Sequence, residues 1–157
     1  MKELVKLLDK QLKYEGHEIK GNEIHIRVTS RRNVLNCPYW GKKSRKVHSK
    51  YRRMIRDMPI SGKKVYMEIV NRKMFCTNVK CTKKTFSERY DFVGSKEKKS
   101  KRLEKEIISI GLNSSSTEAA RMLSRNTVKI SASTVRNLLK KWKIGNRAGI
   151  SNPCVYR

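Results

Sequence analysis

Strict alternation of apolar and polar residues is clearest between residues 23 and 29. The order Glu-Ile-His-Ile-Arg-Val-Thr places Ile24, Ile26 and Val28 on one face, which predicts a half-buried strand. Gly21-Asn22 marks a turn before it, and residues 14–19 are the candidate hairpin partner. Residues 51–58 and 63–75 flank Pro59-Ile60-Ser61-Gly62, whose proline and glycine suit a tight reversal between two antiparallel strands.

Helical spacing of apolar residues appears at both ends of the chain. Near the N-terminus it predicts a short amphipathic helix over residues 2–12. Beyond Gly94 it predicts a lysine-rich helix over residues 96–110, with Leu103, Ile107 and Ile110 on one stripe and Gly111 as its end. A capping box, Ser115-x-x-Glu118, then opens a short helix whose inward residues are expected to be Ala119, Ala120, Met122 and Leu123.

A last helix follows, with Ser131 as its cap and a hydrophobic staple between Ile130 and Val135. Its buried stripe is expected to comprise Ala132, Val135, Leu138, Leu139 and Trp142. The opposite face carries Arg136, Asn137, Lys140 and Lys141. Two short helices with a basic second member are typical of a helix-turn-helix, although many three-helix bundles show the same periodicity.

The charge of the chain indicates what it binds. Lysine and arginine number 39 against 13 acidic residues, a formal net charge of +26 over 157 residues. A charge this large must cover most of the surface, and its common partner is a phosphate backbone, so DNA or RNA binding is expected. An anionic membrane is the main rival, but the sequence shows no long apolar run, signal peptide or lipidation motif. We therefore expect no membrane partner and a cytoplasmic, nucleoid-associated protein.

The four cysteines are distributed as in a metal site. Cys37 lies in Cys-Pro-Tyr-Trp-Gly, and Cys76 and Cys81 lie in Cys-Thr-Asn-Val-Lys-Cys. Paired cysteines a few residues apart at strand-end turns are how small domains supply a tetrahedral zinc site, but Trp40 stands where the fourth thiol is expected. Cys154 lies in the tail and is interpreted as a free thiol.

An ordered set of short motifs resembles a known family. These motifs are Asn36-Cys37-Pro38-Tyr39-Trp40-Gly41, Val47-His48-Ser49-Lys50-Tyr51, Arg56-Asp57-Met58-Pro59, Arg72-x-x-x-Phe75-Cys76-x-x-x-x-Cys81 and Lys84-Thr85-Phe86-Ser87-Glu88-Arg89. Together they resemble the N-terminal region of the ISL-three family of insertion-sequence transposases, from about Glu3 to Lys143. The resemblance implies a zinc-binding domain followed by a helix-turn-helix.

The resemblance assigns Cys37, Cys76 and Cys81 to the family's zinc-ligand positions. Trp40 falls on the fourth position and cannot bind zinc, because an indole offers neither a thiolate nor an imidazole lone pair. Zinc binding is therefore expected to be weak or lost. His48 is an alternative ligand, but its place in the family's H-S-x-Y pattern favours packing or a phosphate contact.

Family members continue into a catalytic domain in which three carboxylates hold two metal ions. This chain has no acidic residue after Glu118, so we expect a protein that is not an enzyme, truncated before that domain. A hydrolase is disfavoured, since no Ser-His-Asp order, paired acids or phosphate loop is present.

The fold class expected is α+β, a small β-rich zinc-ribbon-like domain followed by a three-helix helix-turn-helix domain. The expected boundaries are residues 1–32 for a helix and hairpin, 33–94 for the zinc ribbon, 95–143 for the helix-turn-helix and 144–157 for an unstructured tail.

The leading functional hypothesis is a truncated transposase that binds the terminal inverted repeats of its element as double-stranded DNA without cutting them. Ser133, Arg136, Asn137, Lys140 and Lys141 are the candidate DNA-binding residues, while the other lysines would meet phosphates. A repressor of the intact transposase fits the same residues, with that enzyme or a second copy of the chain as partner. The alternative from another class is an RNA- or ribosome-associated basic zinc-ribbon protein, although the aromatic residues are scattered rather than at stacking spacing.

Overall fold

The computed structural model describes residues 1–147, and the chain divides into two compact units, Met1–Lys101 and Arg102 onward. The fold is α+β, with four helices and a mixed sheet among the described residues. Cys154, interpreted above as a free thiol, lies outside them. No helix in residues 1–147 is long and apolar enough to cross a membrane.

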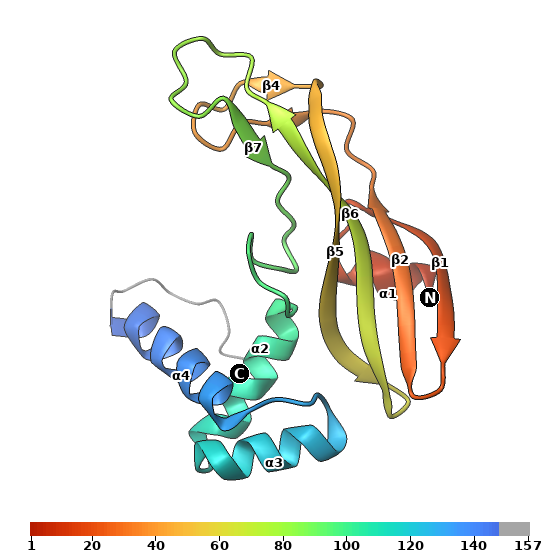
Figure 1. The fold of residues 1–157 in the computed structure, drawn as a ribbon, viewed down its shortest axis with the longest axis vertical. Coiled ribbons are helices and arrows are strands. Elements are labelled where there is room, and N and C mark those ends of the chain that lie inside the picture. Colours follow the sequence, from red (N-terminus) through yellow and green to blue (C-terminus); the bar gives the residue numbers. More distant parts are fainter. Residues whose placement is uncertain (148–157) are drawn as a thin grey trace. The chain divides into compact units, whose positions relative to one another are not determined.

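The first unit is built on one sheet (Figure 1). Its elements are α1 (Lys2–Leu8), β1 (Leu12–Lys20), β2 (Glu23–Ser30), β3 (Leu35–Asn36), β4 (Lys43–Ser44), β5 (Val47–Ile60), β6 (Lys63–Phe75) and β7 (Thr85–Ser87). The strand order is β1-β2-β6-β5, with β7 added beside the end of β6, and β3 pairs with β4 in a separate ribbon. The two predicted hairpins, β1–β2 and β5–β6, are confirmed as antiparallel pairs.

One strand pairing was not predicted. Strands β2 and β6 are parallel neighbours, paired from Glu23 beside Lys64 to Val28 beside Ile69. The segments 1–32 and 33–94, which the sequence analysis treated as separate domains, therefore share one sheet and one compact unit.

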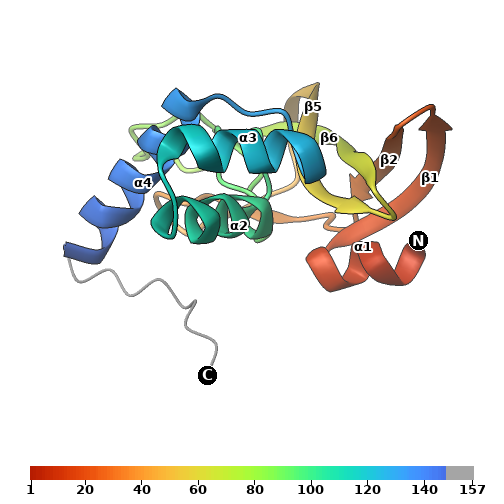
Figure 2. The same cartoon turned by 90° about the horizontal axis from the view of Figure 1, so that it is seen from below.

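The main core lies on one face of this sheet. Ile24, Ile26 and Val28 of β2 are buried as the alternation predicted, together with Val65, Met67 and Ile69 of β6 and Ile55 of β5. Val5 of α1 joins the same cluster, and Figure 2 shows α1 lying against the sheet. The predicted helix over residues 2–12 is too long, because α1 ends at Leu8, Asp9 is extended and Leu12 already pairs with Ser30 in β1.

The second unit is helical, with α2 (Lys101–Leu112), α3 (Ser116–Asn126) and α4 (Ala132–Arg147). Ser115 caps α3 as predicted, since its hydroxyl accepts from the Glu118 N–H at 3.2 Å. The reciprocal half of the capping box is not formed, because the Glu118 carboxylate pairs with Arg121 instead. Ala119, Ala120 and Leu123 are buried, whereas Met122 is 45% exposed and was wrongly placed in the core.

Three helix boundaries differ from those predicted. The lysine-rich helix begins at Lys101 rather than residue 96, and α4 continues to Arg147 instead of ending before an unstructured tail at residue 144. Gly111 does not end α2 but lies buried within it. A Cβ placed there would lie 3.0 Å from a methyl of Val135 and 3.2 Å from one of Leu139, so glycine permits close approach of α4.

Candidate metal centre and nucleic-acid interface

The three cysteines of the first unit meet at one point, although Cys37 is about forty residues from the other two in the sequence. Their sulfur atoms all lie within 4.8 Å of one another, and the Sγ atoms of Cys37 and Cys81 are 4.0 Å apart. Zn–S bonds of about 2.3 Å in a tetrahedron place sulfurs about 3.8 Å apart. The cluster therefore has the dimensions of three corners of a zinc site.

Local structure explains this convergence. Cys37 opens a tight turn between β3 and β4, in which the Gly41 N–H donates to the Cys37 carbonyl at 2.7 Å and Gly41 adopts a positive φ of 67°. Cys76 directly follows β6 and donates its N–H to Lys84 O at 2.8 Å, which folds the second turn back toward β7. The cysteines share a small second core with Leu35, Met74 and Phe86.

Backbone N–H groups point at the sulfurs of Cys37 and Cys81, an arrangement that favours thiolates. Burial raises the pKa of the Cys37 thiol, but the N–H groups of Tyr39 and Trp40 and the neighbouring thiols outweigh it, and the net shift in the pKa of Cys37 is downward. Burial shifts the pKa of the Cys81 thiol upward, although the Lys83 N–H opposes this. Donor chemistry, spacing and backbone support all fit a metal ion held by three thiolates.

Among the described residues, the group that could hold a metal ion consists of the three cysteines. Trp40 directs its backbone N–H to the Cys37 sulfur, and its indole is 53% exposed. His48 is exposed and lies within hydrogen-bond distance of Ser49 Oγ. Its ring packs edge-on against Phe75, with 4.8 Å between the two ring centres. Its packing on Phe75 agrees with the role that the sequence analysis favoured for it.

A buried ion pair connects the metal-binding end to the main sheet. The Arg72 guanidinium donates to both carboxylate oxygens of Glu88, at 2.9 and 3.0 Å, and to the carbonyl of Arg32. Ser30 Oγ donates to the same carboxylate. The sequence analysis placed Arg72 and Glu88 in two motifs but gave neither residue a role. A charged residue of opposite sign in each motif was a signal from which an ion pair could have been predicted.

The five predicted DNA-binding residues all lie on α4 and are all exposed: Ser133, Arg136, Asn137, Lys140 and Lys141. At 100° per residue they fall on a sector about 140° wide, centred opposite the buried Val135. The connection between α3 and α4 spans residues 127–131, and the Ser131 hydroxyl accepts from the Thr134 N–H at 3.3 Å. These side chains give α4 an exposed polar face.

Comparison with known proteins identifies one segment of the chain. No curated protein and no solved structure matches the chain. Residues 33–81 match the family model of the zinc-finger of transposase IS204/IS1001/IS1096/IS1165, and this segment contains Cys37, Cys76 and Cys81. Over these residues the chain is similar to a transposase zinc finger, which confirms the resemblance of the zinc-binding region and indicates a role in nucleic-acid binding.

Proposed function

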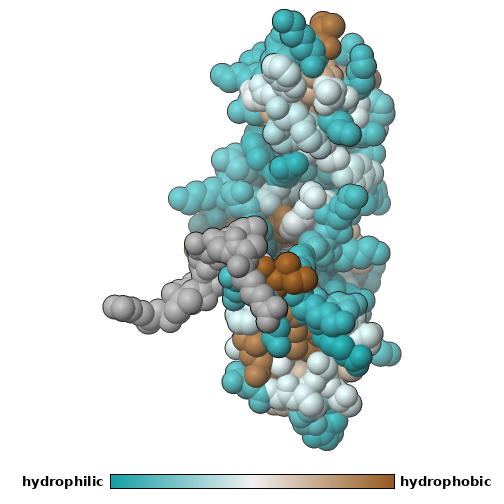
Figure 3. Space-filling model, turned by 90° about the vertical axis from the view of Figure 1, so that its left-hand side faces the viewer, coloured by the Kyte–Doolittle hydropathy of each residue, from teal (hydrophilic) through white to brown (hydrophobic). Residues whose placement is uncertain are grey.

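We propose that this chain binds the terminal inverted repeats of an insertion sequence as duplex DNA, using the recognition modules of an ISL-three family transposase, and does not itself cut the strands. The observation that carries the proposal is the match of residues 33–81 to the transposase zinc finger, in a chain with a net charge of +26. The face in Figure 3 is mostly hydrophilic, as expected for a nucleic-acid-binding surface.

The helices α3 and α4 supply the sequence-specific contacts in this proposal. They pack against each other, and α4 presents Arg136 and Asn137 from its exposed face. Arginine pairs in a bidentate manner with guanine and asparagine with adenine in the major groove. Lys140 and Lys141 lie on the same face, where they would contact phosphates and fix the position of the helix.

The metal centre has a structural role in this proposal. Zinc bound by Cys37, Cys76 and Cys81 would fix the two turns to each other, while Trp40 leaves the fourth coordination position without a protein ligand. We propose that zinc is bound more weakly than at a four-cysteine site, because a missing protein ligand makes the free energy of zinc binding less favourable.

Three buried acids of the first unit are assigned structural roles in this proposal. Asp9 accepts from the N–H groups of Gln11 and Asp91, Asp57 accepts from Ser100, and Glu88 pairs with Arg72. A chain that occupies the ends without cutting would associate with the nucleoid and compete with an intact transposase.

A competition assay with end-sequence and scrambled duplexes at fixed salt tests the proposal. Arg136→Ala/Asn137→Ala should abolish the preference for the end sequence, about 1–3 kcal/mol per base-edge contact, and retain most nonspecific binding. The matched control is Lys105→Ala/Ser109→Ala, which removes one cation and one polar group from exposed positions of α2 and should retain the preference. An unchanged preference in the α4 variant would refute α4 as the reader, and tighter binding of RNA than of either duplex would favour the RNA-binding alternative.

A further inference from the structure

A basic groove follows the outer edge of β5 in the first unit, apart from α4 and from the cysteines. It has a volume of about 690 Å³. Six cations line it: Arg52, Arg53, Arg56, Lys96, Lys98 and Lys99. Glu97 is the one carboxylate among the ten lining residues, so the groove carries a net charge of +5.

The lysines of this groove lie in residues 96–100, which the sequence analysis assigned to a helix. Residues 94–100, here named the lysine segment, instead lie along the edge strand β5, where Arg56 and Lys99 form a parallel bridge. The Arg56 N–H donates to Lys98 O at 2.8 Å, and the Ser100 N–H donates to Arg56 O at 2.9 Å. These main-chain bonds fix the points from which the lysine side chains leave the backbone.

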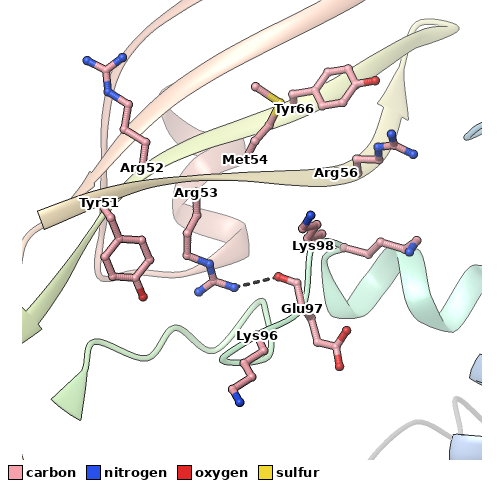
Figure 4. Close-up of a pocket in the computed structure, with 10 residues that line it drawn as sticks. Tyr51, Arg52, Arg53, Met54, Arg56, Tyr66, Lys96, Glu97 and Lys98 are labelled. Carbon is pink, nitrogen blue, oxygen red and sulfur yellow. Dashed lines mark hydrogen bonds between the residues drawn. The ribbon is translucent and has the colours of Figure 1, made fainter. Parts of the chain in front are cut away.

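Side chains hold the lysine segment at both ends. The Arg53 guanidinium donates to the carbonyls of Gly94 and Glu97, at 3.0 and 2.8 Å, and Figure 4 shows its bond to Glu97. The Ser100 hydroxyl donates to a carboxylate oxygen of Asp57 at 2.6 Å, and both residues are buried. The groove is thus a built feature of the fold and not a chance gathering of surface lysines.

Aromatic rings accompany the cations. Tyr51 is 40% exposed, and its hydroxyl accepts from the Asn71 amide at 2.6 Å. The Arg56 guanidinium lies 5.9 Å from the centre of the Tyr66 ring, a cation–π contact that restrains it. Planar guanidinium groups and phenolic rings with restrained orientations are suited to phosphate and sugar contacts.

The dimensions and charge of the groove fit a nucleic-acid strand. Arg52 and Arg56 lie four residue steps apart on extended chain, a span of about 13 Å at about 3.3 Å per step. One strand of duplex DNA presents a phosphate every 3.4 Å or so along its axis, hence about four phosphates over that span. We propose that the groove holds the sugar-phosphate backbone of duplex DNA without regard to sequence, as a second DNA-binding surface. This inference rests on the proposed function, since it assumes that the chain binds DNA.

The test is fluorescence anisotropy of the full chain with a 30-bp duplex of random sequence, titrated at several salt concentrations. Lys96→Gln/Lys98→Gln/Lys99→Gln removes three groove cations but keeps the main-chain bonds of the lysine segment. The matched control, Lys2→Gln/Lys10→Gln/Lys20→Gln, removes the same charge from exposed positions in and near α1 and on β1, the strand at the opposite edge of the sheet. Arg52→Gln serves as a second groove variant whose change lies outside the lysine segment.

The triple groove variant should bind at least tenfold more weakly at 0.1 M salt, and its log–log salt slope should fall by up to about 2.7, at about 0.9 per phosphate contact. The control should change affinity less than threefold. Equal losses in the two triple variants, with no loss in Arg52→Gln, would overturn the proposal. Absence of duplex binding by the parent chain would refute the proposed function itself, and a groove-dependent loss for single-stranded RNA alone would overturn DNA as the occupant.

Discussion

Removing Arg72 from the Arg72–Glu88 ion pair should strongly destabilise the first unit, because the Glu88 carboxylate would stay buried without its main partner. The Glu88 side chain is 0% exposed and that of Arg72 is 17% exposed. Removing one partner of such a pair leaves an uncompensated charge in the interior, at a typical cost of about 3–5 kcal/mol. Arg32 Nε, 3.3 Å from the Glu88 carboxylate, retains part of the attraction, so Arg72→Met should lower the free energy of unfolding by about 3 kcal/mol.

Acid should reduce the loss of stability that Arg72→Met causes. Burial raises the pKa of Glu88, but the hydrogen bonds from Arg72 and Ser30 outweigh burial, so the pKa of Glu88 lies below its ordinary value of 4.5. A carboxyl group with a lowered pKa in the folded state contributes stability that is present above pH 4.5 and is lost as the pH falls through the folded-state pKa. In Arg72→Met the folded protein can protonate Glu88 more readily, so parent and variant should converge in stability toward pH 3.

Equilibrium urea unfolding at pH 7 and pH 3.5, followed by circular dichroism, measures both effects. Arg121→Met is the matched control, because the Arg121–Glu118 pair is exposed to solvent. This substitution should hardly change the free energy of unfolding. The double variant Arg72→Met/Glu88→Leu should recover part of the loss, since no charge then remains buried. A loss below 1 kcal/mol at pH 7, or a difference that does not shrink in acid, would refute this reasoning.

Three further predictions concern the metal centre, the sheet and the helices. Trp40→Cys should bind zinc at least tenfold more tightly in a chelator competition, and equal zinc retention by parent and variant would contradict the three-thiolate site. The hydrogen bond from His25 to Glu68 raises the pKa of His25 above 6.5, so its stabilisation is complete below that pH and is lost as pH rises through the raised value. Urea unfolding should show a larger deficit for His25→Gln at pH 6 than at pH 9, and equal deficits would count against it. Gly111→Leu should destabilise the helical unit by about 1–3 kcal/mol in thermal melting, because a side chain of α4 would lie 3.0 Å from the new Cβ. Gly145→Leu is the control and should not destabilise it, since no atom of the described residues lies within 4 Å of a Cβ placed there.

Local signals in the sequence predicted the strands and caps well. The alternation at Ile24, Ile26 and Val28 gave both the strand and its buried face, because an extended chain places every second side chain on the same side. The Ser115 cap was found because its partner lies three residues away. The cysteine spacing likewise predicted one shared site, which the three neighbouring sulfurs support.

Long-range pairing could not be predicted from these signals. The parallel contact of β2 with β6 joins residues about forty positions apart, and neither strand's pattern specifies its neighbour. Lysine-rich residues 96–100 have good helix propensity, but their main chain bonds to Arg56 on the edge of β5, so tertiary pairing overrides propensity. Gly111 was interpreted as a helix end because its packing against α4 is invisible in one helix alone.

The salt dependence of duplex binding tests the central claim most directly. If the chain neutralises about six phosphates, the slope of log K against log salt for a duplex bearing the element's terminal repeat should be about −5, and binding should collapse by a few hundred millimolar salt. The measurement is an anisotropy titration of the zinc-loaded parent chain at four or more salt concentrations. A slope near zero, or no binding at low salt, would contradict the account that this basic chain holds DNA through its phosphate backbone.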